Sequence, residues 1–253
     1  MRSFSADDYP APPPREAAAS ARIELDTRAL AAALDRWLAG AQPADILSQA
    51  VRLVGRERLA VVSSFGTESA ALLKIVADVD PAIPVVLLDT GWLFAETLAY
   101  RDLLVEKLKL AEVRTIRPDP AALAERDPRG DLWLSDADAC CRLRKVEPLE
   151  RALQPFDAWV NGRKRYQDGE RTALPVVEAD GWRLKFNPLA RASAAEVAAI
   201  FAAAGLPSHP LAAAGFSSVG CLPCTRRSPP GEAPRAGRWD GSAKTECGIH
   251  TPR

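Results

Sequence analysis

RLAVVSSFGTESAALLKIVADVDPAIPVVLLDTG, residues 58–91, holds two short apolar runs with a longer segment of helical spacing between them. The runs in RLAVVSSFG (58–66) and IPVVLLDTG (83–91) are apolar without alternation, which predicts strands that are buried on both faces. The segment TESAALLKIVADV (67–79) predicts a helix. A buried strand, a helix and a second buried strand are typical of the βαβ unit of a parallel sheet.

The same alternation extends on both sides of this unit. Ser193 and Glu196 have the spacing of a capping box that opens a late helix, which Gly205 ends. We expect further helices over 27–39, 44–54, 92–110 and 138–153, strands over 112–118 and 157–163, and a hairpin over 174–189 that turns at Asp180-Gly181. The predicted fold is therefore α/β, a doubly wound, mostly parallel sheet flanked by helices.

Composition divides the chain into three parts. Residues 1–22 are rich in proline, alanine and charge, which predicts a flexible leader. Residues 23–225 carry the periodic segments and predict a single α/β domain. Residues 226–253 are rich in proline, glycine and arginine and have little periodicity, so we expect a mobile C-terminal segment.

The charge balance argues against several classes of partner. The 253 residues include 33 basic and 33 acidic side chains, so the formal net charge is zero. Non-specific binding of nucleic acid or of a membrane surface needs a basic excess, so we expect neither partner. The N-terminus has no apolar signal region, and no stretch approaches about 18 continuous apolar residues, so we expect a cytoplasmic protein.

Two predicted strand ends carry polar groups suited to an anionic ligand. Ligands of doubly wound folds bind beyond the carboxyl ends of the strands. SSFGTES offers hydroxyls, a glycine and a helix N-terminus, and LDTG offers a carboxylate, a hydroxyl and another glycine. Either motif by itself is equally compatible with a capped turn between a strand and a helix.

Four of the five cysteines form two close groups. Cys140 and Cys141 are adjacent, and Cys221 and Cys224 form a CxxC pair. Without an export signal, such cysteines are more typical of metal ligands or nucleophiles than of disulfides. Zinc commonly uses two CxxC pairs, whereas adjacent thiolates suit a cluster that presents several irons. The pattern favours an iron–sulfur cluster and leaves zinc, or four structural thiols, as alternatives.

Basic residues crowd the same segments. RLRK, GRKR, TRR and PRAGR contain ten of the 33 lysines and arginines. A single run of this kind is often a solvated surface. Four runs near a predicted four-thiolate site indicate a compact polyanionic substrate, held by guanidinium and ammonium groups.

The fifth cysteine, Cys247, lies in KTECGIH, residues 244–250. Lys244 and His250 flank it, and nearby cations favour the reactive thiolate form. An incidental exposed cysteine is the alternative. A thiol on a mobile segment is suited to attack a bound substrate and then to be regenerated by an external dithiol.

Three motifs together identify a family. CCRLRKVEPL, GCLPCTR and the terminal KTECGIH resemble the signature of the assimilatory adenylyl-sulfate reductases, relatives of the phosphoadenylyl-sulfate reductases. The resemblance covers about residues 45–253 and implies an adenine nucleotide alpha hydrolase-like fold. The terminal motif marks the wider family. The two cysteine pairs mark the branch that carries a 4Fe-4S cluster and usually prefers adenosine 5′-phosphosulfate.

The resemblance implies a covalent mechanism. Cys247 would attack the sulfuryl sulfur, release AMP and leave an enzyme S-sulfocysteine. Thioredoxin or a similar dithiol would then release sulfite, as a step of sulfate assimilation and cysteine biosynthesis. Lys145 matches a lysine between cluster and sulfate, and His250 matches the histidine of the terminal motif. The implied cluster ligands are Cys140, Cys141, Cys221 and Cys224.

The resemblance also implies a substrate site and an assembly. Relatives are commonly homo-oligomeric, so we expect a homo-oligomer. Trp92 follows LDTG in this chain, where family members often have arginine. The implied substrate-binding residues are Ser63, Ser64, Gly66, Asp89, Thr90, Gly91, Arg163, Arg165, Arg235 and Arg238.

Three other functions compete with this interpretation. A reductase could use the 3′-phosphorylated nucleotide, alone or as well. An ATP-using enzyme that thiolates tRNA is disfavoured, because the chain lacks a Gly-Gly-x-Asp-Ser loop and a basic excess. A zinc-stabilised binding module would leave Cys247 and the polar strand ends without a role.

Overall fold

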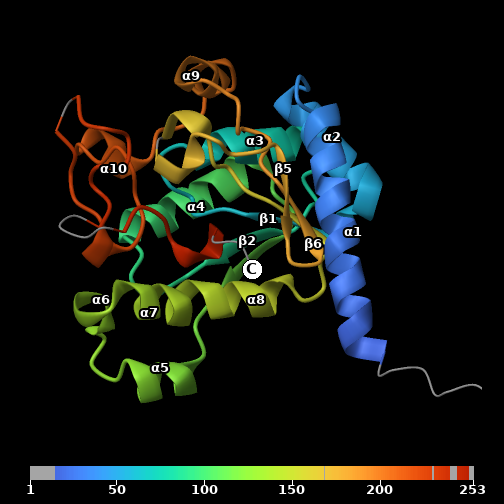
Figure 1. Cartoon of the computed structure of the whole chain (residues 1–253). Coiled ribbons are helices and arrows are strands. Elements are labelled where there is room, and N and C mark those ends of the chain that lie inside the picture. Colours follow the sequence, from blue (N-terminus) through green and yellow to red (C-terminus); the bar gives the residue numbers. More distant parts are fainter. Residues whose placement is uncertain (1–14, 168, 230, 240–243, 251–253) are drawn as a thin grey trace, which may run out of the picture.

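The computed structural model describes residues 15–167, 169–229, 231–239 and 244–250. It contains a six-stranded sheet in the order β3-β2-β1-β4-β6-β5, in which only β5 runs antiparallel to its neighbour (Figure 1). The strands are β1 (Leu59–Val62), β2 (Val85–Leu88), β3 (Val113–Ile116), β4 (Ala158–Val160), β5 (Val177–Asp180) and β6 (Arg183–Phe186). The order reverses between β1 and β4, where doubly wound folds bind their ligands.

Helices cover both faces of the sheet (Figure 1). One layer contains α2 (Pro43–Val54), α3 (Ser69–Val79), α4 (Ala95–Leu108) and α9 (Ala194–Ala203), with α1 (Arg15–Trp37) packed against β5. The opposite layer contains α5 (Pro120–Arg126), α6 (Leu132–Ser135), α7 (Ala137–Cys141) and α8 (Glu147–Leu153). The short α10 (Pro210–Ala213) packs against α4.

The alternation of side chains along β1 divides the core in two. Leu59 and Val61 point into one apolar cluster, and Ala60 and Val62 point into the other, as the pleat of a strand requires. Every residue of β1 and β2 is buried, because each face of these strands is covered by helices. The predicted doubly wound, mostly parallel sheet is confirmed.

Several local predictions are also confirmed. Ser193 and Glu196 form the predicted capping box at the start of α9. The hairpin of β5 and β6 is present and turns at Gly181-Trp182, one residue later than predicted, and Gly181 has a φ of 60°, a conformation that glycine adopts without a steric penalty. The first helix begins at Arg15 rather than near residue 27, so it overlaps the predicted leader at 15–22. The rest of that leader, 1–14, lies outside the described residues.

The predicted helix over 138–153 is interrupted, which corrects the expectation of one regular helix. The chain is helical from Ala137 to Leu153, but Arg142–Val146 forms a π turn between α7 and α8. Pro148 explains the interruption, because proline has no N–H for the carbonyl of Arg144 and its ring would clash with that carbonyl. The π turn immediately follows the adjacent cysteines and carries Lys145.

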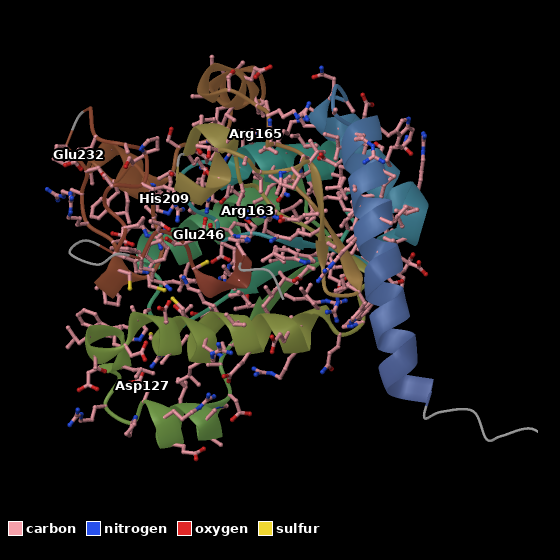
Figure 2. All side chains as sticks on the ribbon, viewed as in Figure 1. Asp127, Arg163, Arg165, His209, Glu232 and Glu246 are labelled. Atoms are coloured by element: carbon pink, nitrogen blue, oxygen red, sulfur yellow. The ribbon has the colours of Figure 1, made fainter. Side chains whose placement is uncertain are left out.

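The described part of the C-terminal segment lies against the domain. Its backbone pairs with the CxxC region, since the N–H of Trp239 donates to the carbonyl of Cys224 at 3.1 Å. A short 3₁₀ turn, η7 (Gly248–His250), places Ile249 against the core cluster beneath the sheet. Figure 2 shows Glu246 in the interior and Glu232 at the periphery. The mobility of this segment stays a prediction.

Among the described residues, no helix is both long enough and apolar enough to cross a membrane.

Candidate active site and cysteine cavity

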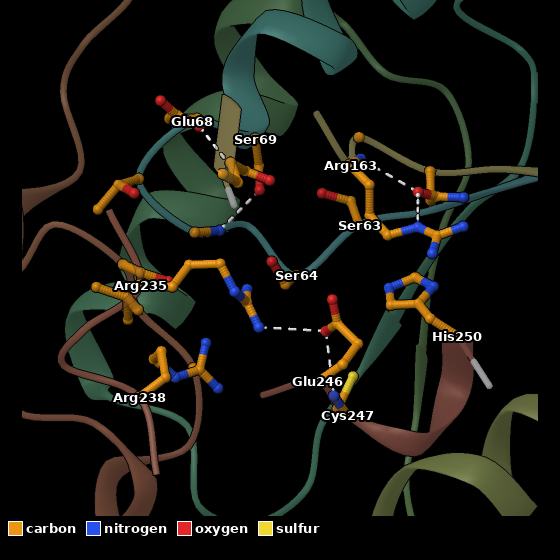
Figure 3. A pocket seen from close by; sticks show the side chains of 18 of the residues that line it. Ser63, Ser64, Glu68, Ser69, Arg163, Arg235, Arg238, Glu246, Cys247 and His250 are labelled. Atoms are coloured by element: carbon orange, nitrogen blue, oxygen red, sulfur yellow. Dashed lines mark hydrogen bonds and ion pairs between the residues drawn. The ribbon is translucent and has the colours of Figure 1, made fainter. Parts of the chain in front are cut away.

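A pocket opens at the carboxyl ends of β1 and β4, where the strand order reverses. Ser63, Ser64 and Gly66 line it from the loop after β1, and Arg163 lines it from the loop after β4. Cys247 closes another side from the C-terminal segment (Figure 3). The structure thus brings together residues from three distant parts of the chain, as parallel strands with a common carboxyl edge allow.

The pocket is strongly cationic. In the described part of the chain, two carboxylates line it, those of Glu68 and Glu246. The basic side chains that line it are Lys145, Arg163, Lys164, Arg171, Arg235 and Arg238. This imbalance favours an anionic ligand, because buried cations need a counter-ion or hydrogen-bond acceptors.

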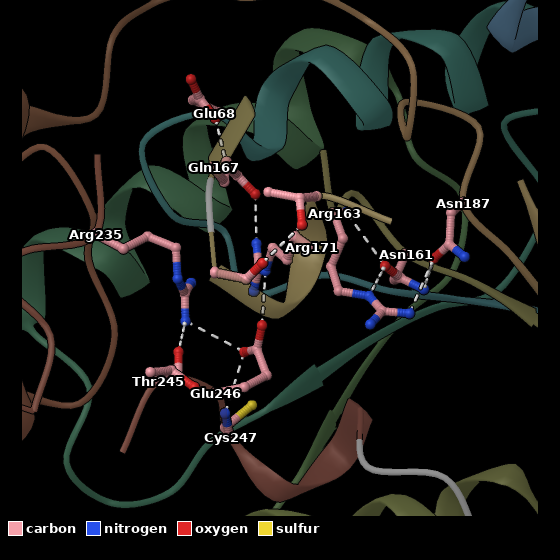
Figure 4. A network of polar contacts seen from close by, with 12 residues as sticks. Glu68, Asn161, Arg163, Gln167, Arg171, Asn187, Arg235, Thr245, Glu246 and Cys247 are labelled. Carbon is pink, nitrogen blue, oxygen red and sulfur yellow. Dashed lines mark hydrogen bonds and ion pairs between the residues drawn. The ribbon is translucent and has the colours of Figure 1, made fainter. Parts of the chain in front are cut away.

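Glu68 fixes the loop after β4. Its carboxylate pairs with Lys164 Nζ at 3.1 Å and accepts hydrogen bonds from Tyr166 Oη at 2.6 Å and from Gln167 Nε2 at 2.7 Å. Arg163 is held by different partners, the side chains of Asn161 and Asn187 (Figure 4). It also pairs with Glu178. Both basic residues therefore have a fixed position before any ligand binds.

Cys247 and His250 lie on the same short terminal turn. The His250 ring stacks on the indole of Trp159, a residue of β4, with centroids 6.0 Å apart and an interplanar angle of 11°. Burial, and then the charges of Arg163, Lys185 and other cations, lower the pKa of His250 well below its ordinary value. The imidazole is therefore neutral at pH 7, so the expected cationic effect of His250 on Cys247 is absent. His250 is left as a neutral hydrogen-bonding group.

Glu246 ties the terminal segment to the pocket (Figures 3 and 4). One carboxylate oxygen pairs with Arg171 Nε at 2.6 Å and the other with Arg235 Nη2 at 3.2 Å. Burial alone would raise the pKa of Glu246, but hydrogen bonding and charge from Arg171 lower it overall, so the carboxylate is ionised. Burial and the neighbouring charge of Arg171 lower the pKa of Arg235 to about 10.

Glu246, Cys247 and His250 form a group of possible metal ligands. A carboxylate oxygen, the thiol sulfur and a ring nitrogen lie within 4.8 Å of one another. However, both oxygens of Glu246 already face guanidinium groups, and basic side chains surround the group. A cation at this point would be repelled, so the arrangement favours an anion.

The other four cysteines line a second cavity together. Cys140 and Cys141 come from α7, just before the π turn, and Cys221 and Cys224 flank a 3₁₀ turn. Three of these cysteines are buried and Cys224 is half-buried. The loop carrying the CxxC pair is pinned to the loop after β2, because the N–H of Leu222 donates to the carbonyl of Trp92 at 2.7 Å.

The residues of this cavity fit an iron–sulfur cluster. Four soft sulfur donors converge on one buried space, as such clusters require. Burial raises the pKa of the Cys140 thiol to about 12, so a thiolate at this position would need the positive charge of a bound metal to stabilise it. Trp92 also lines the cavity, and its Nε1 donor is buried without an acceptor among the described residues. A sulfur acceptor in the cavity would satisfy this donor.

Lys145 lines both the pocket and the cysteine cavity. Burial alone would lower the pKa of this lysine, but the nearby sulfurs of Cys221, Cys247 and Cys141 raise it overall, so Lys145 is charged. The same lysine counters burial at Cys221, whose pKa is lowered with further help from a Thr90 hydroxyl 3.3 Å from the sulfur. The two sites are therefore electrostatically connected.

Other predicted substrate-binding residues have different positions. Thr90 and Gly91 lie beside the cysteine cavity, where Arg144 donates to the carbonyl of Thr90 at 2.8 Å. Asp89 pairs with Arg117 at 2.9 Å. Arg165 donates to the carbonyl of Leu174. None of these four predicted residues is among the described residues that line the pocket, whereas Arg235 and Arg238 are.

Some site residues were not found from the sequence. Arg171, Lys164 and Glu246 line the pocket, and Glu246 lies beside the predicted nucleophile in KTECGIH. Because Glu246 directly precedes the candidate nucleophile Cys247, the sequence alone could have indicated that it lies at the site. Arg171 gave no comparable signal, because it lies outside the four basic runs and its role depends on a tertiary contact with Glu246.

Comparisons of sequence point to one family. Residues 58–227 match the phosphoadenosine phosphosulfate reductase domain. An adenosine 5′-phosphosulfate reductase of Mesorhizobium japonicum is 49% identical over 222 residues, covering 88% of this chain and 87% of that protein. One from a Chelativorans species is 52% identical over 194 residues, covering 77% and 79%. A phosphoadenosine 5′-phosphosulfate reductase of Gloeobacter violaceus is 40% identical over 213 residues, covering 82% and 88%.

Solved structures support the fold. The phosphoadenylyl-sulfate reductase of Candida auris, in complex with phosphate, has a TM-score of 0.65 at 24% identity and covers 78% of this chain and 96% of that one. FMN adenylyltransferase of Candida glabrata, in complex with ATP, has a TM-score of 0.54 at 14% identity, covering 83% and 73%. At these identities the likeness concerns the fold alone. It confirms the predicted adenine nucleotide alpha hydrolase-like architecture.

The sequence relatives decide between the classes of protein considered. Their shared description as reductases confirms the prediction of an oxidoreductase and disfavours the tRNA-thiolating enzyme and the zinc-binding module. The family model spans more than half of the chain, and two relatives share about half of their aligned residues with it. The chain therefore belongs to the adenosine 5′-phosphosulfate and phosphoadenosine 5′-phosphosulfate reductase family.

Proposed function

We propose that this protein reduces adenosine 5′-phosphosulfate to sulfite and AMP in sulfate assimilation, with Cys247 as the nucleophile. The observation that carries the proposal is the position of Cys247. It lines the same pocket as six basic side chains, one of which, Lys145, also lines the cysteine cavity. A thiol in a cationic pocket is suited to attack a substrate whose own negative charge would otherwise repel it.

The first half of the reaction transfers the sulfuryl group. The Cys247 thiolate attacks the sulfuryl sulfur, a sulfur–sulfur bond forms, and the bond from sulfur to the phosphate oxygen breaks. AMP leaves with that oxygen and its electron pair. The basic groups Lys145, Arg235 and Arg238 neutralise the charge that develops on the leaving phosphate. The product on the enzyme is an S-sulfocysteine.

The second half regenerates the thiol. An external dithiol, such as thioredoxin, attacks Sγ of Cys247, and sulfite leaves with the electron pair of the sulfur–sulfur bond. The second thiol of the donor then attacks the mixed disulfide and restores the Cys247 thiolate. The donor loses two electrons and becomes a disulfide, which balances the reduction of the sulfuryl sulfur.

Cys140, Cys141, Cys221 and Cys224 would hold a 4Fe-4S cluster, consistent with the donor set of their cavity. When bound, the cluster supplies a fixed structure and local charge rather than electrons, because the dithiol already provides both electrons of the reaction. Lys145 connects that charge to the pocket, where it faces Cys247.

The test compares two substrates in the anaerobically purified enzyme with thioredoxin and thioredoxin reductase. Sulfite release is measured with adenosine 5′-phosphosulfate and, in parallel, with the 3′-phosphorylated nucleotide. We expect the first substrate to give the higher kcat/KM. Faster turnover of the 3′-phosphorylated nucleotide would establish the alternative preference, and no sulfite from either would refute the proposed function.

A further inference from the structure

We propose that Glu246 is an internal counter-ion, which occupies an anion subsite of the pocket and is displaced when the anionic part of the substrate binds Arg171 and Arg235. The inference rests on the proposed function, since it assumes a phosphosulfate substrate. It assigns to Glu246 a role distinct from that of its neighbour Cys247. Glu246 competes with the substrate before the reaction, and its displacement frees the segment that carries the thiol.

The geometry of the carboxylate supports the first part. The two oxygens of Glu246 face two different guanidinium groups, Arg171 at 2.6 Å and Arg235 at 3.2 Å (Figure 4). The side chains of Glu246 and Arg171 are only 10% and 9% exposed. A carboxylate between two guanidinium groups presents an anionic oxygen to each of them, as a sulfate or phosphate group in the same place would.

The position of Glu246 in the chain distinguishes it from the other carboxylates near the pocket. Glu68 and Glu178 pair with Lys164 and Arg163, and these four residues belong to the central α/β domain. Glu246 instead lies on the terminal segment, next to Cys247, whose backbone N–H donates to Glu246 Oε1 at 3.1 Å. Movement of Glu246 therefore changes the position of the nucleophile.

The exchange follows from the energetics of buried charge. Two largely buried guanidinium groups are costly to leave without a counter-ion, so Glu246 departs readily only when another anion replaces it. Binding of the substrate anion releases the carboxylate and loosens the attachment of Cys247. Loss of that anion after reaction lets Glu246 return to the two arginines. Substrate occupancy and the docking of the terminal segment are thus coupled.

The test measures binding without reaction, in cluster-loaded enzyme that carries Cys247→Ser. Isothermal titration calorimetry gives the Kd for adenosine 5′-phosphosulfate with and without the additional change Glu246→Gln. We expect the glutamine variant to bind roughly tenfold more tightly, because the competing charge is gone. The matched control is Glu232→Gln, which removes an exposed carboxylate 3.5 Å from Arg226 on the same segment and leaves the Kd unchanged.

Turnover provides the second measurement. With Cys247 intact, Glu246→Gln should lower kcat severalfold while the affinity for substrate rises, since the product anion is then also bound more tightly and leaves more slowly. A merely structural role would weaken both binding and turnover. Weaker or unchanged binding in the glutamine variant would overturn the inference. If the Cys247→Ser parent, folded and loaded with its cluster, binds no adenosine 5′-phosphosulfate, the proposed function itself fails.

Discussion

The cysteine cavity and the terminal turn 244–250 meet near Lys145, but they are held in place by different interactions. The cavity is built on α7 and on a loop pinned by backbone hydrogen bonds, and three of its four thiols are buried. The terminal turn is held by the ion pairs of Glu246, the stack of His250 on Trp159 and the contact of Ile249 with the core. The first region belongs to the scaffold, whereas we predict that the second can separate from it without unfolding the sheet.

Cys247→Ser should separate the two regions most clearly, because we expect it to abolish activity without affecting the cysteine cavity. This change removes the nucleophile, so sulfite production should fall to background. Iron content and thermal stability should stay at the values of the unmodified enzyme, because the cysteine cavity does not include Cys247. The measurements are sulfite release, iron analysis and a thermal scan on the same sample. Residual turnover above background would exclude Cys247 as the nucleophile.

Cys140→Ser should instead affect the cavity and the chemistry together. The hydroxyl is a poor ligand for a soft iron site, so we expect loss of most iron and of activity. The apparent Tm should also fall, because metal binding contributes to the stability of the folded state. Normal iron content in this variant would show that Cys140 is not a ligand. The cysteine cavity would then not be the metal-binding region that we contrast with the terminal turn.

Asp127→Asn tests whether the stability of the region around the cysteine cavity depends on a buried ion pair. Asp127 pairs with Arg144, in the π turn after the adjacent cysteines, at 2.5 Å, and their side chains are 0% and 9% exposed. Leaving Arg144 without its partner should lower the free energy of unfolding by about 3 kcal/mol. Urea unfolding measures this change, and Glu125→Gln, at an exposed residue of the nearby helix α5, is the control.

The same pair predicts a pH dependence. Burial by itself would raise the pKa of Asp127, but the hydrogen bonds and charge of Arg144 lower it overall. The stabilisation is therefore fully present above the unfolded-state pKa of about 4 and is lost as the pH falls through the lower folded-state value. The difference in stability between the unmodified protein and Asp127→Asn should shrink on acidification below about pH 4. A difference that grows on acidification would contradict this assignment.

Gly220→Ala should give the smallest effect of these substitutions. It should change substrate binding in the pocket and leave the stability of the protein unchanged. A Cβ at Gly220 would overlap the guanidinium group of Arg238, so that flexible side chain must move. We expect a severalfold rise in KM for adenosine 5′-phosphosulfate with no change in Tm. Gly40→Ala is the matched control, since no atom lies within 4 Å of a Cβ at that position. An unchanged KM would mean that the observed position of Arg238 is not needed for binding.

The sequence predicted the sheet and the cysteine cavity well, because their signals are local. Unbroken apolar runs revealed β1 and β2, and the adjacent and CxxC cysteines converge as their pairing implied. The interruption of the predicted helix at Arg142–Val146 was missed, although Pro148 is its physical cause. Pro148 lies in the interior of the helix predicted over 138–153, so its presence there was a usable signal of the interruption.

The polar pocket was harder to predict, because its partners are far apart in sequence. Arg171 and Glu246 are 75 residues apart and meet only in the folded protein. Arg165, in the basic run GRKR, was expected at the substrate but donates to the carbonyl of Leu174. The basic run GRKR thus indicated which segment lies at the pocket. Which of its side chains faces the pocket depends on the path of the backbone after β4.

The most direct test of the account is the intact mass of the anaerobically purified protein after mixing with adenosine 5′-phosphosulfate and no reductant. We expect a gain of one SO₃ group, mapped by peptide analysis to Cys247, with release of an equal amount of AMP. Absence of the adduct in enzyme that contains its cluster, or an adduct on any other cysteine, would contradict the central claim that the terminal thiol is the nucleophile.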